Sequence, residues 1–178
     1  MDNTFPQAVF LDRDGTIGGT RHALLPDAFA LYSFARQAID ALKSAGIRVF
    51  SFTNQPGIAR GEATYEEVAS QLLSFGFDGA YLCPHQDGDG CSCRKPLPGM
   101  LIQAASEWSL DLSACVVVGD SWRDILAAHA AGAKKILVMT GSGTYALQRL
   151  KDLNPEVQLN LIAENLEEAV EAILQGTL

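Results

Sequence analysis

The chain has 178 residues, of which 48% are hydrophobic, and a formal net charge of -8 at pH 7. This size fits one ordinary domain, spanning 1–178, that buries a core without disulfides. With only 13 Lys and Arg residues, the chain lacks the clustered positive charge needed to bind nucleic acid through its phosphates, so we expect small-molecule partners and no nucleic acid.

Residues 1–6 lack the basic and apolar segments of a signal peptide, and no apolar run approaches the roughly 18 residues of a membrane span. We therefore expect a cytoplasmic protein without a membrane partner, and a monomer. Three of the four cysteines lie together between positions 83 and 93, which in a reducing compartment favours a metal site over disulfides. The fourth, Cys115, is expected to be a buried strand residue.

Apolar runs alternate with segments of helical periodicity along most of the chain. The predicted strands are 8–11, 49–52, 80–83, 115–118 and 136–139, and the predicted helices are 31–45, 65–73, 100–108, 125–131 and 166–174. The segment 141–160 shows only weak helical character. Strands and helices in alternation predict right-handed crossovers and a parallel sheet. We therefore expect an α/β fold with a doubly wound, Rossmann-like sheet in a three-layer sandwich.

Four sets of polar residues follow one another along the chain, and three of them lie at predicted strand ends. They are Asp12-Arg13-Asp14-Gly15-Thr16, Thr53-Asn54, Arg94-Lys95 and Gly119 to Asp124. An isolated pair of aspartates is more often a solvated turn or a helix cap. Ligand sites of open parallel sheets lie beyond the carboxyl ends of the strands, however, so the shared position of these sets points to one site.

These residue types match what phosphoryl transfer requires: a nucleophile, cations for the phosphoryl oxygens and an acid for the leaving oxygen. Asp12 could form an aspartyl phosphate if a hard cation screened its repulsion from the phosphate. Mg²⁺ suits this role, with Asp12, Asp120 and a main-chain carbonyl near Asp14 as ligands, and with Asp124 supporting from outside the ligand set. In a simpler interpretation, Asp120 and Asp124 only cap a helix. Lys95 alone would more often be a surface residue.

In this order the four sets resemble the haloacid dehalogenase (HAD) superfamily of aspartate-nucleophile phosphatases, whose motifs are DxDGT, a Ser or Thr after the second strand, a Lys, and GDxxxD. The resemblance runs from Val9 to about Gly143. It implies the following roles: Asp12 as nucleophile, Asp14 as general acid and base, Thr53 and Lys95 as phosphoryl contacts, and Asp120 as Mg²⁺ ligand. Asp14 should then favour its neutral form more than Asp12 does. The short connections imply a HAD-like core without a large cap domain.

Three thiols and one imidazole lie within the zinc loop 83–93, in Cys83-Pro84-His85 and Cys91-Ser92-Cys93. Three cysteines and one histidine form a complete tetrahedral Zn²⁺ set of the structural kind, which would order the glycine-rich stretch 86–90. A redox-active or free-thiol loop is the alternative. Because the loop runs directly into Arg94-Lys95, ordering it would place two cations at the mouth of the site.

The arrangement CPH…CxCRKP is similar to the HAD subfamily of heptose 1,7-bisphosphate 7-phosphatases and histidinol-phosphate phosphatases. The residues 57–61 and 95–100 are closer to the heptose enzymes, whereas the short stretch between His85 and Cys91 is closer to the histidinol-phosphate type. The resemblance implies hydrolysis of a small phosphorylated metabolite, first the 7-phosphate of a heptose bisphosphate. Histidinol phosphate or another sugar phosphate is the alternative. The expected substrate contacts are Asn54, Gln55, Arg94, Ser121, Arg21 and His22.

Two other classes of function remain as alternatives. The first is a zinc-ordered binding module without turnover, which the complete set of Asp12, Asp14, Lys95 and Asp120 disfavours. The second is a phosphotransferase or mutase, which must keep water away from the aspartyl phosphate. A site without a large cap domain stays open to water, which disfavours this second class.

Overall fold

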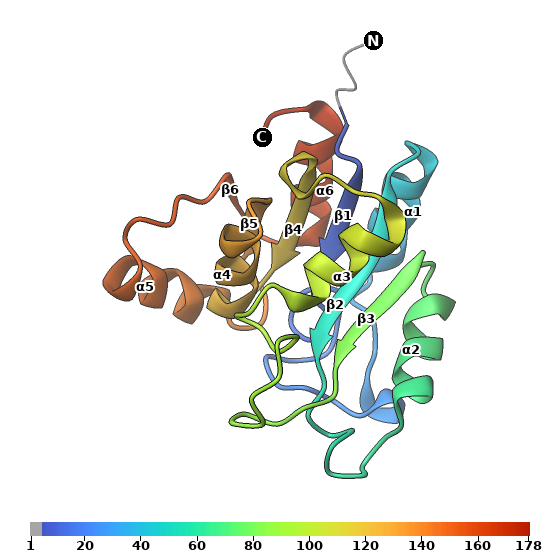
Figure 1. Ribbon diagram of the computed structural model, residues 1–178. Coiled ribbons are helices and arrows are strands. Elements are labelled where there is room, and N and C mark those ends of the chain that lie inside the picture. Colours follow the sequence, from blue (N-terminus) through green and yellow to red (C-terminus); the bar gives the residue numbers. More distant parts are fainter. Residues whose placement is uncertain (1–4) are drawn as a thin grey trace.

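The computed structural model describes residues 5–178 and shows one twisted sheet with helices on both faces (Figure 1). Six parallel strands lie in the order β3-β2-β1-β4-β5-β6. They are β1 (Ala8–Leu11), β2 (Arg48–Asn54), β3 (Gly79–Cys83), β4 (Cys115–Gly119), β5 (Lys134–Val138) and β6 (Leu161–Ala163). The expected doubly wound α/β fold is therefore confirmed.

Alternation along the strands explains how the helices divide between the two faces. Val9 and Leu11 of β1 pack in one cluster with residues of three helices: α1 (Ala35–Ser44), α2 (Tyr65–Ser74) and α6 (Leu166–Gln175). Ala8 and Phe10 point to the other face, which is covered by α3 (Gly99–Trp108), α4 (Trp122–Ala130) and α5 (Gly143–Leu153). A strand that is apolar on both sides must be covered on both sides, which gives the three layers.

The carboxyl ends of β1 and β4 form the point where the sheet order reverses. From β1 the chain continues to β2 on one side, and from β4 it continues to β5 on the other. The two connections diverge there and leave a crevice between them. Asp12 follows β1 directly, Asp120 follows β4 and Thr53 lies near the end of β2, so the fold brings three of the four motif sets to one edge.

The structure differs most from the expected elements in two places. The helix expected from residue 31 begins at Ala35, because Leu31 bridges to Gly18 and the Tyr32 amide donates to the Ile17 carbonyl instead. The weakly patterned segment 141–160 contains all of α5, and the short strand β6 follows it. No helix within residues 5–178 is long and apolar enough to cross a membrane.

Candidate active site

Three buried carboxylates meet at the crevice between β1 and β4. Asp12, Asp120 and Asp124 each present an oxygen, and these oxygens all lie within 4.8 Å of one another. The Asp12 amide donates to the Val118 carbonyl, so the β1–β4 ladder continues into the site. Asp124 lies in the first turn of α4, and its carboxylate accepts from the Ser121 amide as part of a capping box. Oxygen ligands grouped in this way suit Mg²⁺.

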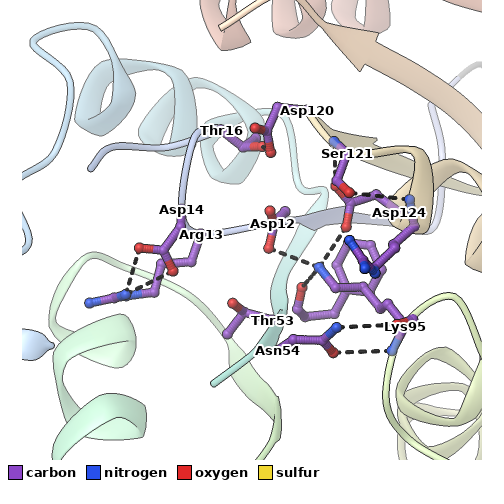
Figure 2. Close-up of polar contacts among 12 residues, drawn as sticks. Asp12, Arg13, Asp14, Thr16, Thr53, Asn54, Lys95, Asp120, Ser121 and Asp124 are labelled. Carbon is purple, nitrogen blue, oxygen red and sulfur yellow. Dashed lines mark hydrogen bonds and ion pairs between the residues drawn. The ribbon is translucent and has the colours of Figure 1, made fainter. Parts of the chain in front are cut away.

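Lys95 enters the same cluster from the loop after β3 (Figure 2). Its Nζ donates to Asp12 Oδ1 at 2.8 Å, to Asp124 Oδ1 at 2.6 Å and to the Phe52 carbonyl at 3.0 Å, and its side chain is only 4% exposed. Burial opposes the positive charge, but attraction to the two carboxylates outweighs it and raises the pKa of Lys95. The lysine is therefore a buried cation with a fixed direction, not the surface lysine of the simpler interpretation.

One ammonium does not balance three buried carboxylates. Burial, followed by repulsion from Asp12 and Asp124, raises the pKa of Asp120 to about 9. Burial and repulsion from Asp12 raise the pKa of Asp124 to about 6, although Lys95 opposes the shift. The cluster is therefore short of positive charge above pH 6, and a divalent cation with oxygen ligands would supply it.

We expect the metal-free protein to lose stability as the pH rises. The unfolded pKa of an aspartate is about 3.9, so the folded state binds more protons than the unfolded state between that pH and the raised folded pKa values of Asp124 and Asp120. The contribution of these two carboxyl groups to the free energy of unfolding is fully present below about pH 4. It is lost as the pH rises through 6 for Asp124 and 9 for Asp120. Thermal melts of the metal-free protein, recorded with and without added Mg²⁺, should show a larger increase in melting temperature at about pH 8.5 than at about pH 5.5. An increment independent of pH would contradict the charge balance described here.

Two glycines close the backbone around Asp120. Gly15 and Gly141 both have positive φ, at +85° and +55°, and a Cβ built on either would collide with the Asp120 carboxylate. Asp120 also accepts hydrogen bonds from the Thr16 hydroxyl and from the Ser142 amide. The aspartate is thus enclosed by backbone that only glycine can provide at these two positions.

Asp14 lies apart from the three-carboxylate cluster, although it is only two residues from Asp12. Its oxygens accept from Arg13 Nη1, from the Leu24 amide and from Gln55 Nε2. Burial raises the pKa of Asp14 and outweighs the opposing effect of Arg13. A side chain that lines the cavity and favours its neutral form is suited to give a proton to a leaving group.

The residues expected around a bound phosphate have different surroundings. Thr53 lines the cavity, and Asn54 pairs with the main chain of Lys95 through both its Oδ1 and its Nδ2. Gln55 was expected to contact the substrate, but it does not line the cavity. The backbone amide of Gln55 donates to the Cys83 carbonyl and continues the β2–β3 pairing. The side chain of Gln55 is therefore directed inward, where Nε2 donates to Asp14 and Thr53. Gln55 therefore positions two site residues instead of facing the substrate space.

A cavity of about 300 Å³ opens above the carboxylates, and its rim is cationic. Arg21, Arg94 and Arg123 all line it, together with His22 and Ser121. Arg21 and His22 come from the strap, which we define as residues 19–29 between β1 and α1. Ser121 Oγ accepts from the Arg123 amide, so it caps α4 as well as lining the cavity. Arg94 Nη1 donates to the His85 carbonyl, which ties this guanidinium to the zinc loop.

The zinc loop brings its four candidate ligands together. Cys83 Sγ lies 3.7 Å from Cys91 Sγ and 3.6 Å from His85 Nδ1, and Cys93 Sγ lies 3.3 Å from the same nitrogen. Tetrahedral zinc, with bonds of about 2.3 Å to sulfur and about 2.0 Å to nitrogen, separates two sulfurs by about 3.8 Å and sulfur from nitrogen by about 3.5 Å. The cluster therefore has the dimensions of a zinc site. Cys115 is buried in β4, as expected.

Comparisons with known proteins agree with this site. A family model described as HAD-hydrolase-like matches residues 92–169. The D-glycero-beta-D-manno-heptose-1,7-bisphosphate 7-phosphatase of Bordetella bronchiseptica is 39% identical over 150 residues, which cover 78% of this chain and 84% of that protein. The protein of the same name from Yersinia pestis is 42% identical over 154 residues, covering 75% and 81%. The chain belongs to the HAD-like hydrolase family.

A solved structure extends the likeness over nearly the whole of this HAD-like hydrolase. The D,D-heptose 1,7-bisphosphate phosphatase of B. bronchiseptica, crystallised with magnesium and phosphate, is 36% identical and has a TM-score of 0.81. The match covers 95% of this chain and 98% of the other. The predicted family, the fold and the class of enzyme, a phosphoric monoester hydrolase, are confirmed.

Reasoning from the sequence missed three residues of this HAD-like hydrolase that the structure places at the site. Arg13 binds Asp14, Arg123 lines the cavity, and the Ser142 amide binds Asp120. Arg13 had a visible signal, because an arginine between two aspartates after a buried strand is itself expected to be buried. Ser142 had none, since it contributes only a main-chain amide.

Proposed function

We propose that this protein is a Mg²⁺-dependent phosphatase that removes the 7-phosphate of D-glycero-β-D-manno-heptose 1,7-bisphosphate. The single observation that favours this substrate over histidinol phosphate is the cationic rim of the cavity. One phosphate is served by Lys95 and the metal at the floor, which leaves Arg21, Arg94 and Arg123 to meet another group. The 1-phosphate of a bisphosphate is an anion that guanidinium groups bind well. Histidinol phosphate instead carries a positively charged amine, which these residues would repel.

In the proposed mechanism Asp12 attacks phosphorus. Lys95 holds Asp12 Oδ1, so the other carboxylate oxygen is free to form the bond. Asp12, Asp120 and the main-chain carbonyl near Asp14 are the proposed Mg²⁺ ligands, and bound Mg²⁺ would screen the repulsion between the nucleophile and the phosphate. Lys95 neutralises charge that builds on the phosphoryl oxygens, and the Thr53 hydroxyl holds them by hydrogen bonding. Asp124 keeps Lys95 in place and anchors α4.

Asp14 handles the protons in both halves of the proposed reaction. In the first half its carboxyl gives a proton to the leaving sugar oxygen as the P–O bond breaks. In the second half the resulting carboxylate takes a proton from the water that attacks the aspartyl phosphate. Hydrolysis then frees Asp12 and inorganic phosphate. Water can reach the intermediate because, within residues 5–178, the chain between β1 and α1 forms only the strap with the 3-10 turn Pro26–Ala28.

The substrate proposal is tested by kcat/KM values for both anomers of heptose 1,7-bisphosphate, for heptose 7-phosphate, for histidinol phosphate and for hexose phosphates. We expect the β-bisphosphate to exceed histidinol phosphate by more than about tenfold, or about 1.4 kcal/mol. A preference for histidinol phosphate would overturn the substrate but not the phosphatase. Absence of hydrolysis across the whole panel would overturn the enzyme itself.

A rim variant tests the assignment of the 1-phosphate. In Arg123→Gln we expect the preference for heptose 1,7-bisphosphate over heptose 7-phosphate to fall about tenfold or more, because one charged hydrogen bond contributes about 1.5–3 kcal/mol. The kcat/KM for the monophosphate should change little. Equal losses on both substrates would show that Arg123 does not contact the second phosphate.

We assign structural Zn²⁺ to Cys83, His85, Cys91 and Cys93, supported by their tetrahedral spacing. In Cys91→Ser we expect loss of bound zinc, a lower melting temperature and a higher KM, because Arg94 depends on the His85 carbonyl for its position. Metal analysis should find about one zinc per chain in the wild type and in the control Cys115→Ala. Full activity in a zinc-free variant would contradict the link between this loop and the substrate.

We propose a single domain that works as a monomer, because the proposed catalytic residues Asp12, Asp14, Thr53 and Lys95 already form a complete set on one chain. We also propose a cytoplasmic location, since zinc binding needs the three loop thiols in reduced form.

A further inference from the structure

Two aspartates from one turn point in different directions in this structure. Figure 2 shows the Asp12 carboxylate turned toward Lys95, and the Asp14 carboxylate turned away from it toward Arg13. The side-chain oxygens of Asp12, Asp120 and Asp124 form one cluster, and Asp14 is not a member of it. Two buried cations thus separate two chemically identical side chains.

Arg13 is held in a single orientation. Its side chain is 0% exposed, and its guanidinium carbon lies 3.9 Å from the centre of the Phe29 ring. Nη1 donates to both Asp14 oxygens, at 3.0 and 2.9 Å, and to the Leu24 carbonyl at 2.8 Å, and Nη2 donates to Gln71 Oε1 at 3.0 Å. A buried guanidinium is tolerated only when it is paired in this way, so these contacts fix the direction of the Asp14 carboxyl.

We propose that Arg13 is a positioning residue for the proton transfer, a role that rests on the proposed phosphatase function. Arg13 keeps Asp14 out of the metal cluster and directs it at the leaving oxygen of the substrate. Without this contact, the Asp14 side chain could rotate toward the cation beside Asp12. It would then act as one more metal ligand and no longer as the acid. Arg13 and Lys95 therefore give the two aspartates separate roles.

The same guanidinium connects the acid to the strap. Leu24 bonds through both its backbone groups, since its amide donates to Asp14 Oδ1 and its carbonyl accepts from Arg13. Gln71 of α2 accepts from Arg13 and donates to the Pro26 carbonyl at 2.7 Å. The strap carries Arg21 and His22 over the cavity. Contacts between the strap and a substrate therefore fix the position of the leaving oxygen relative to the Asp14 carboxyl that protonates it.

The test compares two phosphate monoesters that differ in their need for an acid. Para-nitrophenyl phosphate releases a stable phenolate and needs little protonation, whereas glycerol phosphate releases an alkoxide and needs a proton. In Arg13→Met we expect kcat/KM for glycerol phosphate to fall by about 10²-fold or more, the range that general acid catalysis contributes. The kcat/KM for the aryl ester should fall less than about fivefold. Arg13→Lys should recover part of the glycerol phosphate activity.

A double-variant cycle separates positioning from a purely structural role. In Asp14→Asn the acid is already absent, so adding Arg13→Met should cause no further selective loss on glycerol phosphate. Gln71→Met, which removes one anchor of Arg13, should show the same selectivity with a smaller loss. If Arg13→Met does not fold, Gln71→Met and Arg13→Lys still test the proposal. Lys43→Met, which breaks an ion pair with Asp78 away from the site, is the control and should show no selectivity.

Equal losses on the two esters, or a selective loss that persists in the Asp14→Asn background, would overturn the role of Arg13. A wild-type protein that hydrolyses neither these esters nor heptose 1,7-bisphosphate would overturn the proposed function instead. The two failures are therefore distinguishable.

Discussion

Replacing Asp12 with Asn is expected to remove turnover while leaving the fold intact. The amide of asparagine is nearly isosteric with the carboxylate but is not nucleophilic, so no aspartyl phosphate forms. Loss of a covalent nucleophile reduces kcat on the order of 10⁴-fold or more. The same substitution removes one of three mutually repelling buried charges, which lowers the pKa values of Asp120 and Asp124 toward their ordinary range.

The measurement is phosphate release from para-nitrophenyl phosphate with Mg²⁺, together with trapping of the acyl phosphate state by beryllium fluoride. In the wild type the beryllium adduct should form on position 12 and should require a divalent ion. Asp14→Asn is the matched control, since it keeps the nucleophile. With an aryl ester it should accumulate phosphorylated protein, because no base remains to activate water. Turnover by Asp12→Asn, or an adduct on another side chain, would refute the nucleophile assignment.

The location of the site could be predicted because it depends on topology. Parallel strands end at one edge of a sheet, so Asp12, Thr53 and Asp120, each at or after a strand end, had to come close together. Lys95 follows no strand directly, and its place was expected from the resemblance to the HAD motifs. The structure puts it among two carboxylates and the Phe52 carbonyl.

The partners of individual side chains could not be predicted in the same way. The sequence shows an arginine between two aspartates, but which of them it binds depends on Leu24 and Gln71, 11 and 58 residues away in the chain. The motif predicts Gln55 as a substrate contact, whereas strand pairing directs its side chain inward to Asp14. The start of α5 gave no signal either, because Ser142 makes no side-chain cap.

Replacing Lys95 with Met is expected to reduce both activity and stability. The ammonium is the one basic side chain that pairs with the buried carboxylates of Asp12 and Asp124 within residues 5–178. Removing one member of a buried ion pair destabilises a protein by about 3–5 kcal/mol, because it leaves buried charge without a partner. We expect kcat to fall about 10³-fold, since the phosphoryl oxygens also lose a fixed cation.

The pH dependence distinguishes this explanation from simple loss of packing. Without Lys95 the folded pKa of Asp124 rises further above the unfolded value, because Lys95 opposes that shift, so the folded state binds still more protons. The destabilisation should therefore be small at low pH, where the carboxylates are protonated, and should grow as the pH rises. Urea titrations without added Mg²⁺ at about pH 5.5 and about pH 8.5 measure it.

Lys95→Arg is the matched control for charge. The Lys95 ammonium lies 4.3 Å from the centre of the Phe52 ring and donates to two carboxylates at once. The substitution keeps the positive charge but replaces this ammonium with a planar guanidinium. We expect it to restore most of the stability at high pH and little of kcat, because a point charge and a planar fork do not present the same donors to a phosphoryl group. Equal instability of the Met variant at both pH values would show that Lys95 acts through packing and not through the charges of Asp12 and Asp124.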